Sequence, residues 1–353
     1  MTNTFTYTAE EKARLREAAR ADHLRTLHDT SVYERDDLGF SSNRLIQATL
    51  PYTDTGESRY VSRNGNLTVT ITSLGSYGLP YGVYPRLLLL WLTTAVIHNA
   101  ATFAPDDPER LKIHFGSNLS AFMHNLGIDA RYSSYTGADG KRRDDNSVRM
   151  QEQIKRLFNM NINVEEAVSG NSPDGTIEGV RTTNTLASQR LELFWSRHDS
   201  HDPAQASLLD SYVVLSAEFF NMLASNPVPL DMGMIRALKR SPMALDVFCW
   251  TSYRASYAKR PFTVPVADLM RQFGTRLDPD NAGDRRSFMQ KMRKAVEAVH
   301  KVWPESGETL ANGDCKLQVL PRGKGIMVYP FRSPAVPKKK MFLEGTGKRK
   351  PRV

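Results

Sequence analysis

The sequence contains little cysteine and no long apolar run, and both absences narrow the class of protein. Two cysteines occur among 353 residues, Cys249 in an apolar helix and Cys315 in an expected hairpin, which argues against a disulfide scaffold and fits a reducing cytoplasm. The longest apolar segment, Leu87 to Val96, is interrupted by two threonines and is shorter than the roughly 20 residues that span a bilayer. The polar start, Met1 to Glu10, carries no secretory signal. We therefore expect a protein of a reducing cytoplasm without a membrane partner.

Motifs of common enzyme classes are also missing. Gly345-Thr346-Gly347-Lys348 lacks the earlier glycine of a phosphate-binding loop, no His-x-His pair occurs as in metal-dependent DNA-nicking enzymes, and there is no Gly-x-Ser-x-Gly elbow. The cluster His198-Asp199-Ser200-His201-Asp202 has no Cys or further His to complete a metal shell, so we interpret it as a solvated polar loop. These absences predict a protein that is not an enzyme and needs no metal or cofactor. A nickase or recombinase is the alternative against which they argue.

Positive charge is concentrated at the C-terminal end. The net charge is +9, and residues 337–353 carry seven Lys and Arg against one acid, a net +6. The rest of the chain therefore carries only +3, so an argument for nucleic-acid binding depends on where its cations lie. Few hydrophobic residues follow Pro334, and we expect residues 334–353 to form a disordered basic tail that adds nonspecific DNA affinity. A role in solubility alone is the alternative.

The stretch from Phe262 to Trp303 predicts a helix-turn-helix. Pro265 suits the first turn of a helix, and Gly274 suits its end because glycine adopts the left-handed conformation at little cost. A long basic helix follows from about Asn281 to Val302, and at about 100° per residue its apolar side chains share one face. The opposite face carries Arg286, Gln290, Arg293 and Lys294. Arg and Gln read guanine and adenine edges in the major groove; an amphipathic helix with a solvated charged face is the alternative.

The same order of parts occurs earlier in the chain. Phe122–Gly127 repeats the pattern of Leu269–Gly274. Each copy follows an apolar helix with an internal Trp, Leu87–Ala100 and Ala244–Tyr257, and the earlier copy also precedes a charged helix, Asp145–Met160. Repetition of this kind indicates two copies of one domain type. The outward residues that we expect to contact DNA on the earlier helix are Arg149, Gln153 and Arg156. Glu152 on the same face leaves open whether this helix reads bases or only phosphates.

Local signals complete the predicted fold. Thr8 and Glu11 form a capping box before a charged helix that reaches about His28, and Asn64-Gly65 predicts a hairpin. Hairpins also follow both basic helices, and we expect them to be wings that grip phosphates through Lys316, Arg322 and Lys324, with Ser287 as a further phosphate ligand. The predicted class is α+β, mostly helical, with two tandem winged-helix domains that carry short β-hairpin wings. The predicted divisions are an N-terminal charged helix and linker (1–49), a first winged helix that contacts DNA (50–225), a second, DNA-binding winged helix (226–333) and the tail (334–353).

Two long blocks resemble the RepA-type plasmid replication initiators of bacteria. Tyr81–Thr94 (YGVYPRLLLLWLTT) looks like the signature of that family, and Asn226–Asp231 (NPVPLD) with Arg236–Asp246 (RALKRSPMALD) forms a second matching block. Phe273-Gly274 and the basic helix follow in the expected order. The resemblance extends over roughly Leu50 to Pro330 and leaves out the N-terminal helix and the tail.

The resemblance implies a protein that binds repeated sites, or iterons, in double-stranded plasmid origin DNA. It further implies local strand opening and recruitment of the host initiator ATPase and replicative helicase. In such initiators a monomer starts replication, while a homodimer, often formed through the first winged helix, represses its own promoter. A winged-helix transcriptional repressor with no role in initiation is the alternative that the sequence leaves open.

Overall fold

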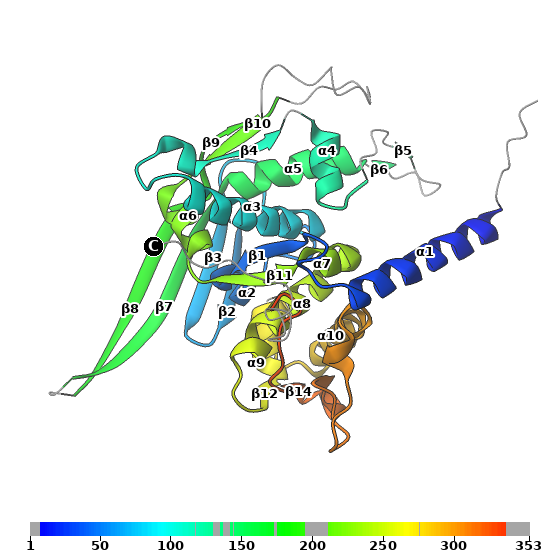
Figure 1. Cartoon of the computed structure of the whole chain (residues 1–353). Helices are drawn as coiled ribbons and strands as arrows, with labels where there is room; N and C mark the ends of the chain where they lie inside the picture. Colours follow the sequence, from blue (N-terminus) through cyan, green and yellow to red (C-terminus); the bar gives the residue numbers. More distant parts are fainter. Residues whose placement is uncertain are drawn as a thin grey trace, which may run out of the picture.

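The computed structural model describes residues 8–116, 118–129, 135–136, 142–143, 145–172, 175–194, 211–274 and 276–336. It is a mixed α and β structure (Figure 1). The α-helices are α1 (Ala9–Asp29), α2 (Asn43–Gln47), α3 (Val83–Thr102), α4 (Leu119–Asn125), α5 (Asn146–Phe158), α6 (Ala217–Ala224), α7 (Met232–Leu238), α8 (Pro242–Tyr257), α9 (Val266–Phe273) and α10 (Ala282–Val302). Short 3-10 helices are η1 (Pro108–Leu111), η3 (Pro304–Gly307) and η4 (Pro321–Gly323). No helix of the described ranges combines the length and apolarity needed to cross a membrane.

The strands form small antiparallel sheets. They are β1 (Leu38–Ser42), β2 (Arg59–Asn64), β3 (Leu67–Ser73), β4 (Lys112–Gly116), β5 (Tyr135–Thr136), β6 (Arg142–Arg143), β7 (Met160–Ser172), β8 (Gly175–Leu186), β9 (Ser188–Glu192), β10 (Ser211–Leu215), β11 (Pro227–Asp231), β12 (Phe262–Pro265), β13 (Leu317–Val319) and β14 (Gly325–Val328). Their orders are β2-β3-β7-β8, β4-β10-β9, β12-β14-β13, β1-β11 and β5-β6. The hairpin predicted at Asn64-Gly65 is confirmed as β2-β3.

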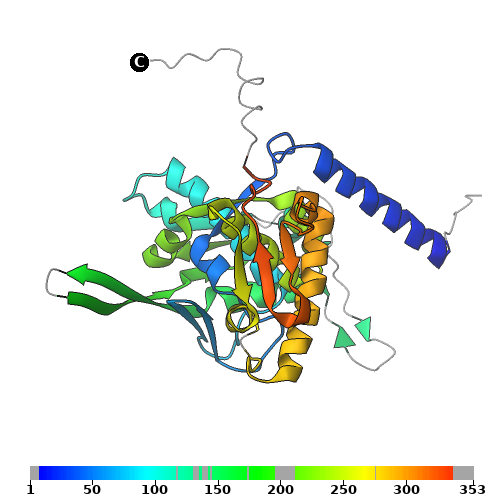
Figure 2. The ribbon, with the colours of Figure 1, turned by 90° about the horizontal axis from the view of Figure 1, so that it is seen from below.

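The basic helix is confirmed as α10, and local chemistry accounts for its start. The Asn281 side chain accepts hydrogen bonds from the backbone N–H groups of Gly283 and Asp284, which satisfies donors that the first helical turn leaves free. Its predicted apolar face is buried, with Phe288, Met292 and Val299 completely enclosed. This face packs against α8, and Figure 2 shows α10 beside the β12-β14-β13 sheet. The opposite face is therefore turned outward.

The expected roles of Pro265 and Gly274 were wrong in detail. Pro265 is the last residue of β12 and occupies the N-cap position of α9, so it precedes the first helical turn. Gly274 has φ −124°, which is not left-handed. A Cβ at Gly274 would lie 2.9 Å from Cδ2 of the buried Phe288, so the position requires glycine for close approach of α9 to α10.

Gly274→Ala is therefore expected to lower the free energy of unfolding by about 1–3 kcal/mol, because the added methyl group overpacks a site where Phe288 cannot move away. Urea unfolding followed by circular dichroism measures the change. Gly179→Ala is the matched control, since its Cβ would meet Val168 Cγ2 at an ordinary 3.5 Å. Equal stability of the two variants would contradict the packing argument.

The segment expected to join two domains is a strand. β11 pairs along its whole length with β1, from Leu38 opposite Asp231 to Ser42 opposite Pro227. The prolines fit because β11 pairs with only one neighbour in a two-stranded sheet. The N-terminal segment that we expected to be a linker thus enters the fold, and one continuous cluster of buried residues contains side chains from both halves. The division near residue 226 stays a prediction.

The two halves share an order of elements but differ in how their strands pair. The second half runs α8, β12, α9, α10, β13, β14, with all three strands in one sheet. The first half runs α3, β4, α4, α5, β7, β8 with the short strands β5 and β6 inserted between α4 and α5, and β4 pairs with β10 while β7 pairs with β3. The β7-β8 hairpin, which follows the first basic helix, is not the short wing that the sequence predicted. Strands β7 and β8 have 13 and 12 residues, and their far end projects from the body in both ribbon views (Figures 1 and 2).

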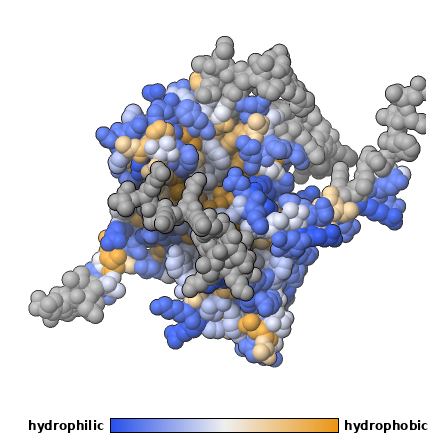
Figure 3. Space-filling model, in the orientation of Figure 1, coloured by the Kyte–Doolittle hydropathy of each residue, from blue (hydrophilic) through white to orange (hydrophobic). Residues whose placement is uncertain are grey.

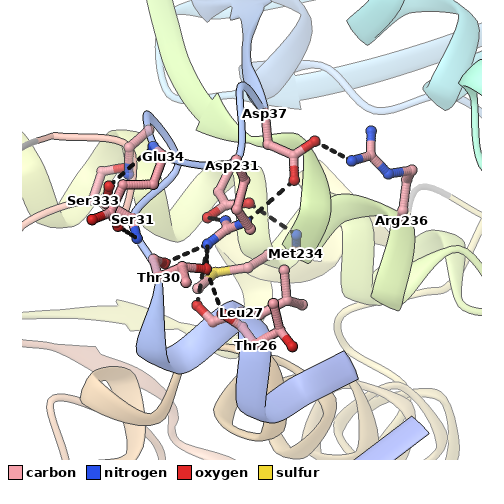
Figure 4. A network of polar contacts seen from close by, with 12 residues as sticks. Thr26, Leu27, Thr30, Ser31, Glu34, Asp37, Asp231, Met234, Arg236 and Ser333 are labelled. Atoms are coloured by element: carbon pink, nitrogen blue, oxygen red, sulfur yellow. Dashed lines mark hydrogen bonds and ion pairs between the residues drawn. The ribbon is translucent and has the colours of Figure 1, made fainter. Parts of the chain in front are cut away.

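Helix α1 extends from the body and is fixed only at its C-terminal end. Its predicted capping box is confirmed, with Glu11 N–H donating to Thr8 Oγ1 and Thr8 N–H to the Glu11 carboxylate. The described side chains before Leu24 are exposed, and the helix surface is mostly hydrophilic in Figure 3. Beyond the helix, Arg35 forms an ion pair with Asp231 and Asp37 pairs with Arg236, which ties the α1–β1 loop to β11 and α7 (Figure 4).

Candidate nucleic-acid interface

The exposed face of α10 and the η4 turn enclose a groove of about 780 Å³. We call it the arginine groove. Its lining residues are Ala282, Arg285, Arg286, Met289, Gln290, Arg293, Arg322 and Gly323. Four guanidinium groups and one carboxamide thus surround a space that no described carboxylate lines. Such a surface attracts anions and offers planar, multiple hydrogen-bond donors.

The backbone brings Arg322 to this groove at a conformational cost. Arg322 has φ +56°, a left-handed conformation that non-glycine residues seldom adopt, and Gly323 follows with φ +66°. Together they reverse the chain between β13 and β14 and place the turn beside Met289 of α10. Strained residues of this kind are often found at functional sites. Three of the four arginines thus come from α10 and the fourth from the η4 turn.

The structure unites part of the predicted second DNA-binding set. Arg286, Gln290, Arg293 and Arg322 share the arginine groove, together with Arg285, which the sequence analysis missed. The helical angle places Arg285 about 100° from Arg286, on the same side of the helix as the buried Met292 and Val296. The η4 turn makes the start of that side part of the groove, and the position of this turn depends on contacts that the local sequence does not encode. Ser287 and Lys324 are exposed beside the groove but outside its lining.

Two predicted lysines lie elsewhere. Lys294 lines a separate pocket on the opposite flank of α10. Lys316, predicted to grip phosphate, is held by Glu305 at 3.2 Å and Glu308 at 2.7 Å, with its side chain only 17% exposed. Desolvation opposes its charged form, but the hydrogen bonds and charges of these two carboxylates together outweigh desolvation and raise the pKa of Lys316. The ammonium group is thus already paired with two carboxylates, which argues against the phosphate contact predicted at this position.

The first predicted set is largely covered. Gln153 is buried, and its Oε1 accepts a hydrogen bond from the Tyr81 N–H at 2.9 Å. Arg156 is only 12% exposed and forms ion pairs with Asp54 at 3.0 Å and Glu152 at 2.6 Å. The loop before α3 crosses the outward face of α5, which is why these two side chains are unavailable for reading bases. This corrects their assignment as DNA contacts.

Arg149 keeps an exposed position on α5. It lines a polar cleft of about 640 Å³ together with Lys239 and Arg240 from the α7–α8 turn, while Asp54, Asp129 and Glu152 line the same cleft. Three cations and three carboxylates balance there, unlike in the arginine groove. The two basic helices therefore present different chemistry to the solvent.

Comparison with known proteins identifies the family. The family described as "Plasmid encoded RepA protein" matches residues 79–261, which is more than half of the chain. The chain belongs to the plasmid-encoded RepA family. This places it among the plasmid replication initiators, in agreement with the resemblance of its two sequence blocks.

Solved structures give a weaker likeness. A crystal structure of selenomethionine derivatives of domains 2 and 3 of RctB is 12% identical with a TM-score of 0.44, over 80% of this chain and 94% of that chain. A second structure, of RctB domains 2–3, is also 12% identical with a TM-score of 0.40 and the same coverage. Comparison with curated proteins finds no significant match.

The RepA family match and the arginine groove involve different parts of the chain. The match begins just before α3 and ends after α8, whereas α10 and η4 follow it. Both blocks that carried the RepA resemblance lie within the matched range. Family membership therefore does not by itself identify the groove residues, and their assignment depends on geometry.

Other candidate chemistry is not brought together in the described part. Within it, no group of three or more His, Cys, Asp or Glu side chains is placed to hold a metal ion. The polar cluster His198–Asp202 and the basic tail from residue 337 lie outside the described residues. Cys249 is a free cysteine inside α8, where burial and the nearby Asp246 carboxylate raise the pKa of its thiol well above the ordinary value.

Proposed function

We propose that this RepA-family protein starts plasmid replication by binding repeated sites in double-stranded origin DNA through the arginine groove. The observation that carries the proposal is the convergence of four arginines and Gln290 on one groove without a described carboxylate in its lining. Binding would be followed by local strand opening and by recruitment of the host initiator ATPase and replicative helicase in the bacterial cytoplasm. A homodimer that represses its own promoter belongs to the same proposal.

The mode of DNA binding that we propose is that of a winged helix. The order α8, β12, α9, α10, β13, β14 supports it, with α10 as the recognition helix and the β13–β14 turn as the wing. Arg286 and Arg293 would donate to guanine edges and Gln290 to adenine, since these side chains match the patterns of those bases in the major groove. Arg285, Arg322 and Lys324 would contact phosphates and fix the register.

The first half would play a different part. Because Gln153 and Arg156 are covered, α5 offers Arg149 as its exposed member of the predicted set. We propose that Arg149 contacts phosphate beside the main site and that the first half serves mainly for assembly. Specific base contacts then come from one recognition helix per protomer.

A footprint on DNA flanking the protein's own gene tests the proposal. We expect protection of repeated sites, with each repeat covering about one turn of major groove, roughly 10 base pairs, on the face read by α10. A transformation assay separates the initiator from a plain repressor, because only an initiator maintains an origin fragment in a host without another initiator. Repeat-specific binding without plasmid maintenance would support the repressor instead.

The basic tail is expected to affect affinity without affecting specificity. Deleting residues 337–353 removes a net charge of +6 and should make the slope of log K against log salt less negative by about 0.9 for every phosphate that the tail neutralises. Fluorescence anisotropy with origin DNA at several salt concentrations measures the slope. The control is the same series with unrelated DNA, for which the change in slope should be equal. An unchanged slope would leave solubility as the role of the tail.

A further inference from the structure

A second pocket lies on the flank of α10 that faces away from the arginine groove. We call it the flank pocket. Its volume is about 520 Å³, and α10 contributes Phe288, Lys291, Lys294, Ala295 and Ala298 to its lining. At 100° per residue, the mean direction of these side chains around the helix axis is almost opposite to that of Arg286 and Arg293. DNA bound in the arginine groove would therefore leave the flank pocket unfilled.

Both halves of the chain build the flank pocket. The segment from Pro51 to Tyr60 forms one wall, the start of α8 at Pro242 and Met243 forms another, and the end of α9 at Phe273 completes it with α10. Its size falls within the roughly 300–1,000 Å³ of sites for small organic molecules. Gly274, Ala295 and Ala298 are small residues in this lining, which accounts for the open space between bulkier neighbours.

Cations lie around this apolar interior. Lys291 and Lys294 are exposed on successive turns of α10, and Arg276 stands beside them in the lining. Arg276 also forms an ion pair with Glu57 at 3.4 Å, and both of these side chains are more than half exposed. No carboxylate belongs to the described lining. An apolar pocket with cations and no acid is complementary to a molecule that is apolar at one end and anionic at the other.

We propose that the flank pocket binds a small amphipathic organic anion, with an aromatic or acyl body between the two halves and a carboxylate, sulfonate or phosphate head at Lys291 and Lys294. A bare phosphate would gain nothing from the apolar walls, because burying a charge there without pairing is costly. A neutral apolar molecule would gain nothing from the lysines. A bound ligand would touch both the Pro51–Tyr60 wall and α10.

The test uses the full chain and two dyes of similar body. 8-Anilinonaphthalene-1-sulfonate carries the anionic head, and N-phenyl-1-naphthylamine lacks it. The variant Lys291→Gln/Lys294→Gln should raise the Kd of the sulfonate about 10-fold, as expected for removal of charge-assisted hydrogen bonds, and should leave the neutral dye unchanged. Lys291→Arg/Lys294→Arg should retain sulfonate binding. Lys301→Gln, an exposed cation of α10 outside the pocket, is the matched control.

A second variant tests the pocket without changing charge. Ala298→Phe places a ring in the half-buried wall and should weaken both dyes, while circular dichroism verifies that the variant is folded. Fluorescence titration without DNA keeps this test independent of the proposed function. Unchanged sulfonate affinity in the Lys291→Gln/Lys294→Gln variant, or absence of saturable one-to-one binding to the native chain, would overturn the proposal.

Discussion

Replacing Arg286, Arg293 and Arg322 together by alanine is expected to abolish specific binding to origin repeats. Each arginine that contacts a base contributes about 1–3 kcal/mol, so a single removal raises Kd by about 5- to 150-fold. The three side chains come from both walls of the arginine groove, and their removal takes away most of its charge. Anisotropy or gel-shift titration with repeat DNA measures the decrease in affinity. Lys301→Ala, on the same helix but outside the groove, should bind like the native protein.

Single variants separate base reading from phosphate contact. Arg293→Ala should relax the preference at one base pair of the repeat, while Lys324→Ala should weaken cognate and unrelated DNA alike and reduce the salt slope by about 1. Selection of binding sites from a randomised repeat reveals the difference. If Arg293→Ala bound the cognate repeat with native affinity and preference, α10 would not be the reading helix.

Periodicity found three of the α10 side chains that line the groove, Arg286, Gln290 and Arg293, but it missed Arg285 and included Lys294. The buried and exposed positions of α10 follow from local helix geometry, and the Asn281 cap is encoded within the next three residues. The same reasoning was wrong for Gln153 and Arg156, although α5 begins and ends close to where it was expected. A helical angle predicts which residues face away from a core, but it does not predict that the loop at Leu79 and Tyr81 will cover that face. Such coverage depends on tertiary contacts across more than 70 residues.

Pairing between strands that are distant in the chain was the other feature that the sequence did not predict. Asn64-Gly65 indicates its hairpin locally, whereas β1 and β11 meet across about 190 residues and carry no local signal of their partner. The two prolines of β11 correctly indicated extended backbone. They gave no sign that Leu38–Ser42 would pair with it, and hence no sign that the supposed linker would join the fold.

The buried ion pair between Arg86 and Asp246 is expected to dominate the stability of the contact between α3 and α8. Arg86 donates to both Asp246 carboxylate oxygens at 2.8 Å, and it also donates to the carbonyl oxygens of Leu50, Pro51 and Gly82. Burial lowers the pKa of Arg86, but the Asp246 charge and hydrogen bond raise it more, so the guanidinium stays charged. Removing the Arg86 guanidinium leaves the Asp246 carboxylate without this partner in a site where only 14% of the Asp246 side chain is exposed.

Arg86→Ala should therefore lower the free energy of unfolding by about 3–5 kcal/mol, as measured by urea denaturation. Replacing both partners, as in Arg86→Met with Asp246→Leu, should recover part of that stability because no unpaired charge remains. Arg14→Ala is the control: its pair with Glu10 is 80% and 82% exposed and should contribute little. A double variant no more stable than Arg86→Ala would show that the carbonyl contacts, not the charge pair, provide the stability.

The position of this ion pair gives the RepA resemblance a physical meaning. Arg86 lies in the first of the two blocks that carried the resemblance, and Asp246 ends the second. The blocks are separated by more than 130 residues, yet they meet at this contact in the core of the molecule. The signature therefore describes how the two halves are joined, whereas the DNA recognition that we propose depends on α10, which lies beyond it. We accordingly expect Arg86→Ala to reduce binding of all DNA sequences in proportion to the unfolded fraction, without changing the base preference that Arg293→Ala alters.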